Sequence, residues 1–349
     1  MNASDGHRVT ISTIADEAGV SVPTVSRVLN GRSDVAPRTR ERVDELLHRH
    51  GYRRRSAASR SEAGLIDLVF DDLDSPWAVE IIRGAEMVAQ EGAVGTVVSA
   101  VHREPGVVQQ WLRNLRGRAS DGVIVVHSDV VPGVQTELQR LDVPLVVVDP
   151  TGGAEGNVRT IGATNWAGGR VATAHLLSLG HQRIACVAGP AGMMCSRARL
   201  DGFRAALDGA GLASDEALVR QGDFSHESGF ACGQAVLAAS SPPTAIVVGS
   251  DQMAFGVYEA VRRCGLRVPE DVSVVGFDDL PQAAWSSPPL TTVRQPLSEM
   301  GAIAARSVLA LARGEQPDVP PRMELSTELV VRDSTTAAPT SLLHHGGGV

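Results

Sequence analysis

Lysine is absent from this sequence, and aromatic residues are scarce. All 32 basic side chains are arginine, and aromatic residues make up 3% of the 349 positions. We attribute the absence of lysine to a compositional bias of the genome. No apolar run approaches the roughly 20 residues that a membrane helix needs, and the N-terminal stretch lacks the apolar segment of a secretory signal peptide. We therefore expect a cytoplasmic protein with no membrane partner.

The sequence also lacks the patterns of a metal site, a disulfide framework or a catalytic centre. Its cysteines, Cys186, Cys195, Cys232 and Cys264, are spaced by 9, 37 and 32 residues. This spacing matches neither zinc ligands nor the paired cysteines of secreted domains. No nucleophile elbow, phosphate-binding loop or zinc-protease motif is found. The sequence thus predicts a reduced protein that is not an enzyme and that holds no metal or cofactor.

Charge is distributed unevenly along the chain, whose formal net charge is −8. Residues 1–60 contain 11 arginines and 7 acidic residues, whereas the remainder contains 21 arginines and 33 acidic residues. A basic first segment joined to an acidic body indicates that only the first segment binds a polyanion.

Beyond residue 60 the sequence alternates short apolar runs with amphipathic stretches of helical length. The expected strands are 65–70, 95–101, 122–126, 144–149, 183–188, 244–249 and 272–278. The expected helices are 77–91, 106–116, 165–179, 196–210, 226–239, 251–264 and 296–313. This alternation predicts β–α–β units, and so parallel sheets with helices on both faces. We expect an α/β body made of two doubly wound domains.

These patterns divide the chain into four parts. Residues 1–52 are expected to form a helical head, 53–64 a polar linker, and 65–333 a two-lobed body. Residues 334–349, which end in HHGGGV, are expected to be a disordered tail.

The head has the sequence signals of a helix-turn-helix unit. Thr10 is placed to cap a helix that ends at Gly19, and Ser21 is placed to cap a second helix with Pro23 in its first turn. A third helix is expected over 37–51. Two helices joined by a tight glycine turn are typical of DNA-binding heads.

A three-helix unit of this size can also be a protein-docking module. Arg27 is expected on the exposed side of the second helix, and the basic charge of the head favours DNA over protein. Apolar residues of the third helix are expected to pack against the other two, namely Val43, Leu46 and Leu47.

The string VTISTIADEAGVSVPTVSRVLNGR at residues 9–32, with the following RTRERV, resembles the head of the lactose/galactose-repressor family of bacterial transcription regulators. Further motifs resemble the family's effector-binding half: IGATNWAGG, LGHQRI, SRARLDGF, GSDQMAFGV, VPEDVSVVGFDDLP and PPLTTVRQP, which lie between residues 161 and 296. Several motifs in the family's order make the resemblance specific. It implies a helix-turn-helix head joined to a two-lobed body like that of periplasmic binding proteins.

The resemblance implies which residues of the head contact double-stranded operator DNA. In the family, a recognition helix enters the major groove, and its base-reading positions are here Val22, Pro23 and Arg27. Arg27 can donate two hydrogen bonds to a guanine, whereas the other two offer only apolar contact. Phosphate contacts are implied for side chains that could also be simple helix caps: Thr10, Ser12, Ser21, Thr24, Ser26, Asn30 and Thr39.

The linker departs from the family pattern. After Tyr52 the family usually continues with Pro-Asn and a hinge helix whose leucine inserts into the minor groove. This sequence continues with arginines and places Ser61 at the leucine position. We expect no leucine wedge, and instead electrostatic contacts with the minor groove or phosphates from Arg53, Arg54, Arg55 and Arg60.

The resemblance also implies an effector cleft between the lobes, at the carboxyl ends of the strands. Polar side chains expected to contact the effector are Asp149, Arg199, Ser250, Asp278 and Gln295. The rings of Trp77 and Phe224 are expected to stack on a sugar ring. Arg199 could instead form a salt bridge between the lobes, and Trp77 could simply pack at a helix start. Trp166 and Trp285 are expected in the core or at the rim.

Together these features predict a ligand-responsive transcriptional regulator, and by family resemblance a repressor, associated with the nucleoid. One head offers few base contacts, so we expect a homodimer on a palindromic operator, with helix 77–91 at the dimer surface. The expected effector is a mono- or oligosaccharide, and a nucleobase or nucleoside is the alternative. A sugar-binding protein without a DNA role is disfavoured by the basic head.

Overall fold

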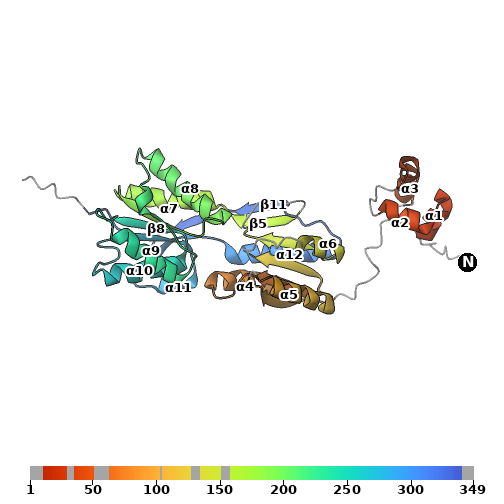
Figure 1. The fold of residues 1–349 in the computed structure, drawn as a ribbon, viewed down its shortest axis with the longest axis horizontal. Helices are drawn as coiled ribbons and strands as arrows, with labels where there is room; N and C mark the ends of the chain where they lie inside the picture. The colour runs from red at the N-terminus through yellow and green to blue at the C-terminus, as the bar shows by residue number, and fades with distance from the viewer. Residues whose placement is uncertain are drawn as a thin grey trace, which may run out of the picture. The chain divides into compact units, whose positions relative to one another are not determined.

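The computed structural model describes residues 11–29, 35–50, 63–102, 104–126, 134–150 and 158–339. The chain forms two compact units, Met1–Ser61 and Glu62–Val349. The first is made of three helices, and the second contains two sheets flanked by helices (Figure 1). This arrangement confirms the predicted fold class.

The first unit packs three short helices around one apolar cluster. They are α1 (Ile11–Ala18), α2 (Val22–Leu29) and α3 (Pro37–Arg49). Gly19 ends α1 with a φ of +68°, a left-handed conformation that glycine adopts without a steric penalty. The Oγ of Ser21 accepts a hydrogen bond from the backbone N–H of Thr24 at 3.3 Å and caps α2. The cluster contains Ile14, Ala15, Ala18, Val25, Val28, Val35, Val43, Leu46 and Leu47.

The first sheet of the second unit lies in the part that we call lobe 1, and its strand order is β11-β5-β4-β3-β1-β2. All of its neighbouring strands run parallel. The strands are β1 (Leu65–Phe70), β2 (Gly95–Ala100), β3 (Gly122–Val126), β4 (Leu145–Val148), β5 (Arg159–Ala163) and β11 (Arg322–Leu325). Helices α4 (Pro76–Glu91) and α12 (Leu297–Ala312) pack on one face, and α5 (Pro105–Arg118) and α6 (Val134–Arg140) pack on the other.

The second sheet lies in lobe 2 and has the corresponding order β12-β10-β9-β8-β6-β7. The strands are β6 (Ile184–Ala188), β7 (Val219–Gln221), β8 (Ala245–Val248), β9 (Ser273–Asp278), β10 (Thr291–Arg294) and β12 (Glu328–Val330). Only the β10–β12 pair is antiparallel among the strand pairs of the described residues. Helices α7 (Asn165–Ser178) and α8 (Met194–Gly209) cover one face, and α9 (His226–Leu237) and α10 (Asp251–Arg263) cover the other (Figure 1). A short helix, α11 (Pro281–Trp285), follows β9.

The chain passes from one lobe to the other three times. It leaves lobe 1 after β5, returns after β10 to form α12, and crosses again between β11 and β12. In both sheets the first strand of the lobe lies between the second and third, so the strand order reverses at the same place. In such sheets ligands bind outside the carboxyl ends of the strands, beside the reversal point.

The seven predicted strands and seven predicted helices are all present, with ends that differ by a few residues at most. The elements that the sequence did not predict are short: β5, β7, β10, β11, β12, α6 and α11. Most of these strands lie towards a sheet edge or carry polar residues, so the apolar periodicity that predicts a buried strand is weak in them.

The predicted tail is wrong for residues 334–338. Ser334 is fully buried, and its Oγ donates to the carbonyl of Val274 at 2.6 Å and accepts from the N–H of Thr291 at 2.8 Å. The N–H of Ala338 donates to the carbonyl of Leu179 at 2.8 Å. This segment is held by hydrogen bonds of its backbone and hydroxyl groups, and not by the burial of apolar side chains. Its polar, small-residue composition is therefore the same as that of a disordered tail. Residues 340–349 lie outside the described part.

Candidate functional site

The second helix of the head presents the predicted base-reading side chains to solvent. Val22, Pro23 and Arg27 are exposed, whereas Val25 and Val28 are buried against the other two helices. Val22 is 39% exposed at the start of the helix. The apolar side of α2 therefore packs within the head, and its exposed side is the one that would face a groove of DNA.

The predicted phosphate-contacting residues are distributed around the same unit. Ser12 lies exposed on α1, Ser21 caps α2, and Thr24 and Ser26 lie half-buried on α2. Thr39 is half-buried in the first turn of α3. The other two of this group, Thr10 and Asn30, lie outside the described residues, as do all four linker arginines.

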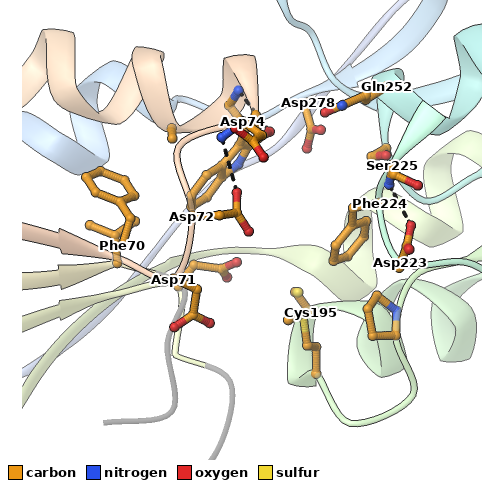
Figure 2. A pocket seen from close by; sticks show the side chains of 18 of the residues that line it. Phe70, Asp71, Asp72, Asp74, Cys195, Asp223, Phe224, Ser225, Gln252 and Asp278 are labelled. Atoms are coloured by element: carbon orange, nitrogen blue, oxygen red, sulfur yellow. Dashed lines mark hydrogen bonds between the residues drawn. The ribbon is translucent and has the colours of Figure 1, made fainter. Parts of the chain in front are cut away.

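The second unit contains a cavity of about 480 Å³ at the carboxyl ends of its strands. Lobe 1 supplies residues at or beyond the carboxyl ends of β1, β3 and β4, and lobe 2 supplies residues at or beyond those of β6, β7, β8 and β9. The predicted effector residues that line it are Trp77, Asp149, Arg199, Phe224, Ser250 and Asp278. Figure 2 shows acidic side chains entering from the β1 side and the ring of Phe224 facing them from lobe 2.

Arg199 lies on α8, lines the cavity and is only 7% exposed. Its Nε donates to Oδ1 of Asn165 at 2.8 Å, and one terminal nitrogen donates to the carbonyl of Gly249 at 2.6 Å. The same nitrogen lies 3.8 Å from the Asp278 carboxylate. This ion pair lies within lobe 2, so Arg199 does not form the alternative interlobe bridge with that aspartate.

Asp278 ends β9 and is buried beside the Arg199 guanidinium. Burial raises the pKa of its carboxyl group to about 6, although Arg199 and a hydrogen bond from Gln295 oppose the shift. The side-chain amide of Gln295 donates to Asp278 at 2.6 Å. Gln295, which we predicted to contact the effector, is not among the residues that line the cavity; its side chain instead holds the Asp278 carboxylate.

A second buried carboxylate shapes the loop after β9. Asp251 accepts hydrogen bonds from the N–H of Leu280 at 2.8 Å and from the hydroxyl of Thr292 at 2.5 Å. Burial, reinforced by the neighbouring Asp278, raises the pKa of Asp251 well above its ordinary value. Asp251 does not line the cavity, but it fixes Leu280, which does.

Three of the lining residues have a backbone conformation that non-glycine residues rarely adopt. The φ angles are +49° at Asp149, +73° at Phe224 and +126° at Asp278. Positive φ is especially unfavourable for a bulky residue such as Phe224. Strained backbone of this kind clusters at ligand sites, where the surrounding structure holds it in place.

Two aromatic rings line the cavity from opposite lobes. Trp77 lies in the first turn of α4, and Phe224 precedes α9. A Cβ added at Gly189 would lie 2.3 Å from the Phe224 ring, so this ring packs directly on backbone. Trp166 and Trp285, which we expected in the core or at the rim, are 48% and 74% exposed, so neither belongs to the core.

Sequence reasoning missed an acidic group at the rim of the cavity, made up of Asp71, Asp72, Asp74 and Asp223. Part of the signal was present, because DDLD directly follows the apolar strand β1, whereas Asp223 follows the short polar strand β7. Residues just after parallel strands face the ligand side of the sheet. Among the described residues, no group of three or more histidine, cysteine or acidic side chains is arranged to hold a metal ion. No helix in this part of the chain has the length and apolar composition needed to cross a membrane.

Comparisons with known proteins agree with both units. Residues 10–55 match the family described as bacterial regulatory proteins, lacI family, and residues 173–335 match the periplasmic binding protein-like domain. The transcriptional regulator CelR of Thermobifida fusca is 35% identical, with 94% of this chain and 98% of CelR covered. This chain belongs to the lacI family.

Other members of the family are similarly close to this regulator. The transcriptional regulator MalR of Streptomyces coelicolor is 37% identical, with 94% of this chain and 97% of MalR covered. The structure of a CelR–cellobiose complex aligns with a TM-score of 0.72 over 94% of this chain and 100% of that chain. A lac repressor dimer bound to operator and an anti-inducer is 31% identical and aligns with a TM-score of 0.70 over 94% of this chain and 99% of its own.

The family membership settles the broad function. The chain is a ligand-responsive, DNA-binding transcriptional regulator of a family that consists of regulators rather than enzymes.

Proposed function

We propose that the cavity binds a sugar-type effector and that the effector releases the regulator from its operator. The observation that carries this proposal is the pair of rings, Trp77 and Phe224, which face one cavity from opposite lobes together with buried polar groups. Flat rings cover the C–H faces of a sugar, while carboxylates accept hydrogen bonds from its hydroxyl groups. The similarity to a protein crystallised with cellobiose supports the same ligand class.

The proposed switch is a change in the angle between the lobes. Asp149 follows β4 in lobe 1, whereas Arg199 and Asp278 belong to lobe 2. A ligand that contacts both sides favours the arrangement in which all contacts form, and it can shift the equilibrium only by its difference in affinity for the two arrangements. The heads join lobe 1 through the linker, so a rotation of the lobes would alter their spacing on DNA.

On DNA, we propose a homodimer that represses from a palindromic operator in the bacterial nucleoid. In each head, Val22, Pro23 and Arg27 would read bases, the hydroxyl and amide side chains already named would contact phosphates, and the linker arginines would bind electrostatically. Exposed apolar side chains on lobe 1 support a second copy as partner, namely Leu73, Val79, Met87 and Val98. Val79 and Met87 lie on α4, the helix that we expect at the dimer surface.

A ligand screen followed by DNA release tests the effector proposal. The full-length protein is screened by thermal shift against mono- and oligosaccharides, nucleobases and nucleosides, and each hit is added to a protein–operator complex. We expect a saccharide to stabilise the protein and to release the DNA. Stabilisation by nucleosides alone would favour the alternative effector class.

Variants locate the effector site. Phe224→Ala and Asp278→Ala should still bind operator but require at least about tenfold more effector for release, a loss of about 1.4 kcal/mol in binding. Trp285→Ala is the matched control, because this exposed ring does not line the cavity. If the effector released wild type and Asp278→Ala at the same concentration, the cavity would not be the effector site.

A further inference from the structure

Two consecutive aspartates at the end of β9 have different surroundings. Asp278 lines the cavity, whereas Asp279 does not. Both have a positive φ, +126° at Asp278 and +58° at Asp279. Non-glycine residues rarely adopt such a backbone conformation, and it persists only where surrounding contacts hold it. The contacts of this pair therefore help to determine where the Asp278 carboxylate lies.

The carboxylate of Asp279 is held between two arginines. Nε of Arg294 donates to its Oδ2 at 2.7 Å, and a terminal nitrogen of Arg332 donates to its Oδ1 at 2.6 Å. The side chain of Asp279 is only 8% exposed, so these charge-assisted hydrogen bonds are partly shielded from water. Arg332 also donates to the carbonyl of Leu290 at 2.7 Å. We call Asp279, Arg294 and Arg332 the arginine clamp.

The two arginines of the clamp lie close to two of the three chain crossings. Arg294 is the last residue of β10, just before the chain enters α12 of lobe 1 at Leu297. Arg332 follows β12, the strand that the chain forms when it crosses back into lobe 2 after β11. In a rotation of two domains, a few residues at such crossings absorb the change in backbone dihedral angles. The clamp thus joins the end of β9 to the lobe 2 side of both crossings.

Gln295, the residue after Arg294, holds Asp278 separately. Its backbone N–H donates to the Asp278 carbonyl at 3.2 Å, and its side-chain amide donates to the Asp278 carboxylate at 2.6 Å. The guanidinium of Arg199 lies 3.8 Å from the same carboxylate. None of these contacts involves Asp279. The Asp278 carboxylate would therefore keep its own partners if the clamp were lost.

The crossing at 295–296 leads into a helix that is tightly packed in lobe 1. A Cβ added at Gly301 of α12 would overlap the backbone of Ile81, and one added at Gly84 of α4 would overlap the backbone of Ser298. Backbone in such close contact leaves no space for one helix to slide past the other. A movement at this crossing would therefore reach α4, the helix that we expect at the dimer surface.

We propose that Asp279 is a positioning residue of the effector switch: through the arginine clamp, it couples a ligand held by Asp278 to the angle between the lobes. With the clamp intact, a rotation that moves the crossing at 295–296 also moves the loop after β9, because Arg294 holds that loop. Without the clamp, the loop can stay on the ligand while the crossing turns. The inference rests on the proposed effector switch and adds a residue that acts in it without lining the cavity.

Asp279→Asn tests this role, because it removes the charge and keeps the size of the side chain. Cellobiose, maltose and adenosine are the probes, and full-length protein is used throughout. Calorimetry gives the Kd of each probe, and anisotropy gives the operator Kd with and without saturating probe. We expect Asp279→Asn to bind the probe that releases wild type within about threefold of the wild-type Kd. The ratio of the two operator Kd values, which is the coupling factor, should fall severalfold towards one.

Further variants separate coupling from a general effect on lobe 2. Arg294→Gln breaks one side of the clamp and should also lower the coupling factor, and adding it to Asp279→Asn should lower the factor no further. Asp271→Asn is the matched control, because this carboxylate is paired with Arg267 at 3.2 Å just before β9. Glu328→Gln removes the other acidic partner of Arg294, 3.7 Å away. Both controls should keep the wild-type coupling factor.

The outcomes separate this inference from the proposed function. If Asp279→Asn kept the wild-type coupling factor, or lost probe binding as fully as Asp278→Ala, the role of Asp279 would be wrong while the effector cavity would stand. If none of the probes released wild type from operator, the proposed switch would fail and the role of Asp279 with it. If Asp279→Asn did not fold, Arg294→Gln would decide, because the Arg294 side chain is half-exposed.

Discussion

At the residue scale, two arginines in this regulator lie in opposite surroundings. Arg27 is exposed on a helix whose other side is buried. Arg199 is buried, stacked on Phe277 and hydrogen-bonded within its own lobe. The first is suited to reading a base, whereas the second organises a cavity.

Replacing Arg27 tests base reading. Arg27→Ala should weaken operator binding by about 1–3 kcal/mol per head and reduce discrimination between operator and scrambled DNA. Arg54→Ala should instead weaken binding to both DNAs similarly and flatten the salt dependence. Fluorescence anisotropy at several salt concentrations measures both effects. If Arg27→Ala distinguished operator from scrambled DNA as well as the wild type does, residues other than Arg27 would have to read the bases.

The buried Asp278 makes stability depend on pH in a definite direction. Its pKa, raised to about 6 by burial, lies above the ordinary value of 3.8, so between these values the folded chain holds a proton that the unfolded chain has released. The free energy of unfolding that Asp278 contributes is therefore present at low pH and is lost as the pH rises through about 6. Asp278→Asn removes this dependence.

We expect the denaturation midpoint of ligand-free wild type to fall relative to that of Asp278→Asn between about pH 4 and pH 7. Urea denaturation at several pH values, with both proteins measured in parallel, checks this. The raised pKa of Asp251 acts in the same direction, and this residue is present in both proteins. Parallel curves across the whole range would show that Asp278 does not titrate as its burial implies.

At the element scale, close helix packing places Arg199. Helices α7 and α8 approach so closely that a Cβ at Gly202 would lie 2.1 Å from the carbonyl oxygen of Trp166, and one at Gly169 would lie 2.1 Å from that of Arg199. Such contacts involve backbone, which cannot move aside as a flexible side chain can. Any side chain at these glycines must therefore move α8, which lines part of the cavity.

Two alanine substitutions on the same helix should have opposite effects. Gly202→Ala should destabilise the protein by about 1–3 kcal/mol or more, because it overpacks the α7–α8 contact. A Cβ at Gly209 has no neighbour within 4 Å, so Gly209→Ala should be neutral or stabilising by up to about 1 kcal/mol. Thermal unfolding measures both, and equal effects would show that α8 can shift without cost.

At the scale of the whole molecule, a ligand-responsive regulator links two equilibria, the binding of its ligand and the binding of DNA. We propose that the three chain crossings that join the lobes let their angle change while each sheet stays intact. If the effector weakens operator binding, the operator must weaken effector binding by the same factor. This reciprocity distinguishes a coupled switch from simple competition with the DNA.

We expect the two affinities to change by the same factor, about 5- to 150-fold, which corresponds to about 1–3 kcal/mol of coupling. Calorimetric titration of the effector into free protein and into the protein–operator complex gives one factor, and anisotropy with and without effector gives the other. If the two factors were unequal, the two experiments would have measured different protein species, for example different oligomeric states.

Oligomeric state has its own test. Analytical ultracentrifugation at micromolar concentration should show two copies of the chain, and Met87→Glu should shift the protein towards a monomer, because a charge would be placed in an apolar contact. Glu91→Gln, an exposed position at the end of the same helix, is the control. A wild-type monomer that binds operator with one chain per site would overturn the dimer.

Much of the fold could be predicted from the sequence, because short stretches of residues determine many of its turns, helices and strands. Gly19, Ser21 and Pro23 mark the turn between two helices through their own backbone preferences. The central strands β3, β6, β8 and β9 are buried on both faces, so their sequences are nearly continuous apolar runs. Asp149 directly follows β4 and Asp278 ends β9, so both lie at the carboxyl ends of strands, where the family resemblance implied the effector cleft.

What only the tertiary structure decided depends on contacts between distant segments. The partner of Arg199 is Asp278, 79 positions later, and the role of Gln295 follows from its hydrogen bond to that same carboxylate. The acidic rim comes from Asp72 and Asp74 in one lobe and Asp223 in the other, which no local pattern brings together. Ser334 is buried because two distant strands offer it hydrogen-bonding partners, although its own neighbours in sequence are those of a tail. Short-range preferences can be read from a sequence, whereas the pairing of charges across a cavity exists only once the chain has folded.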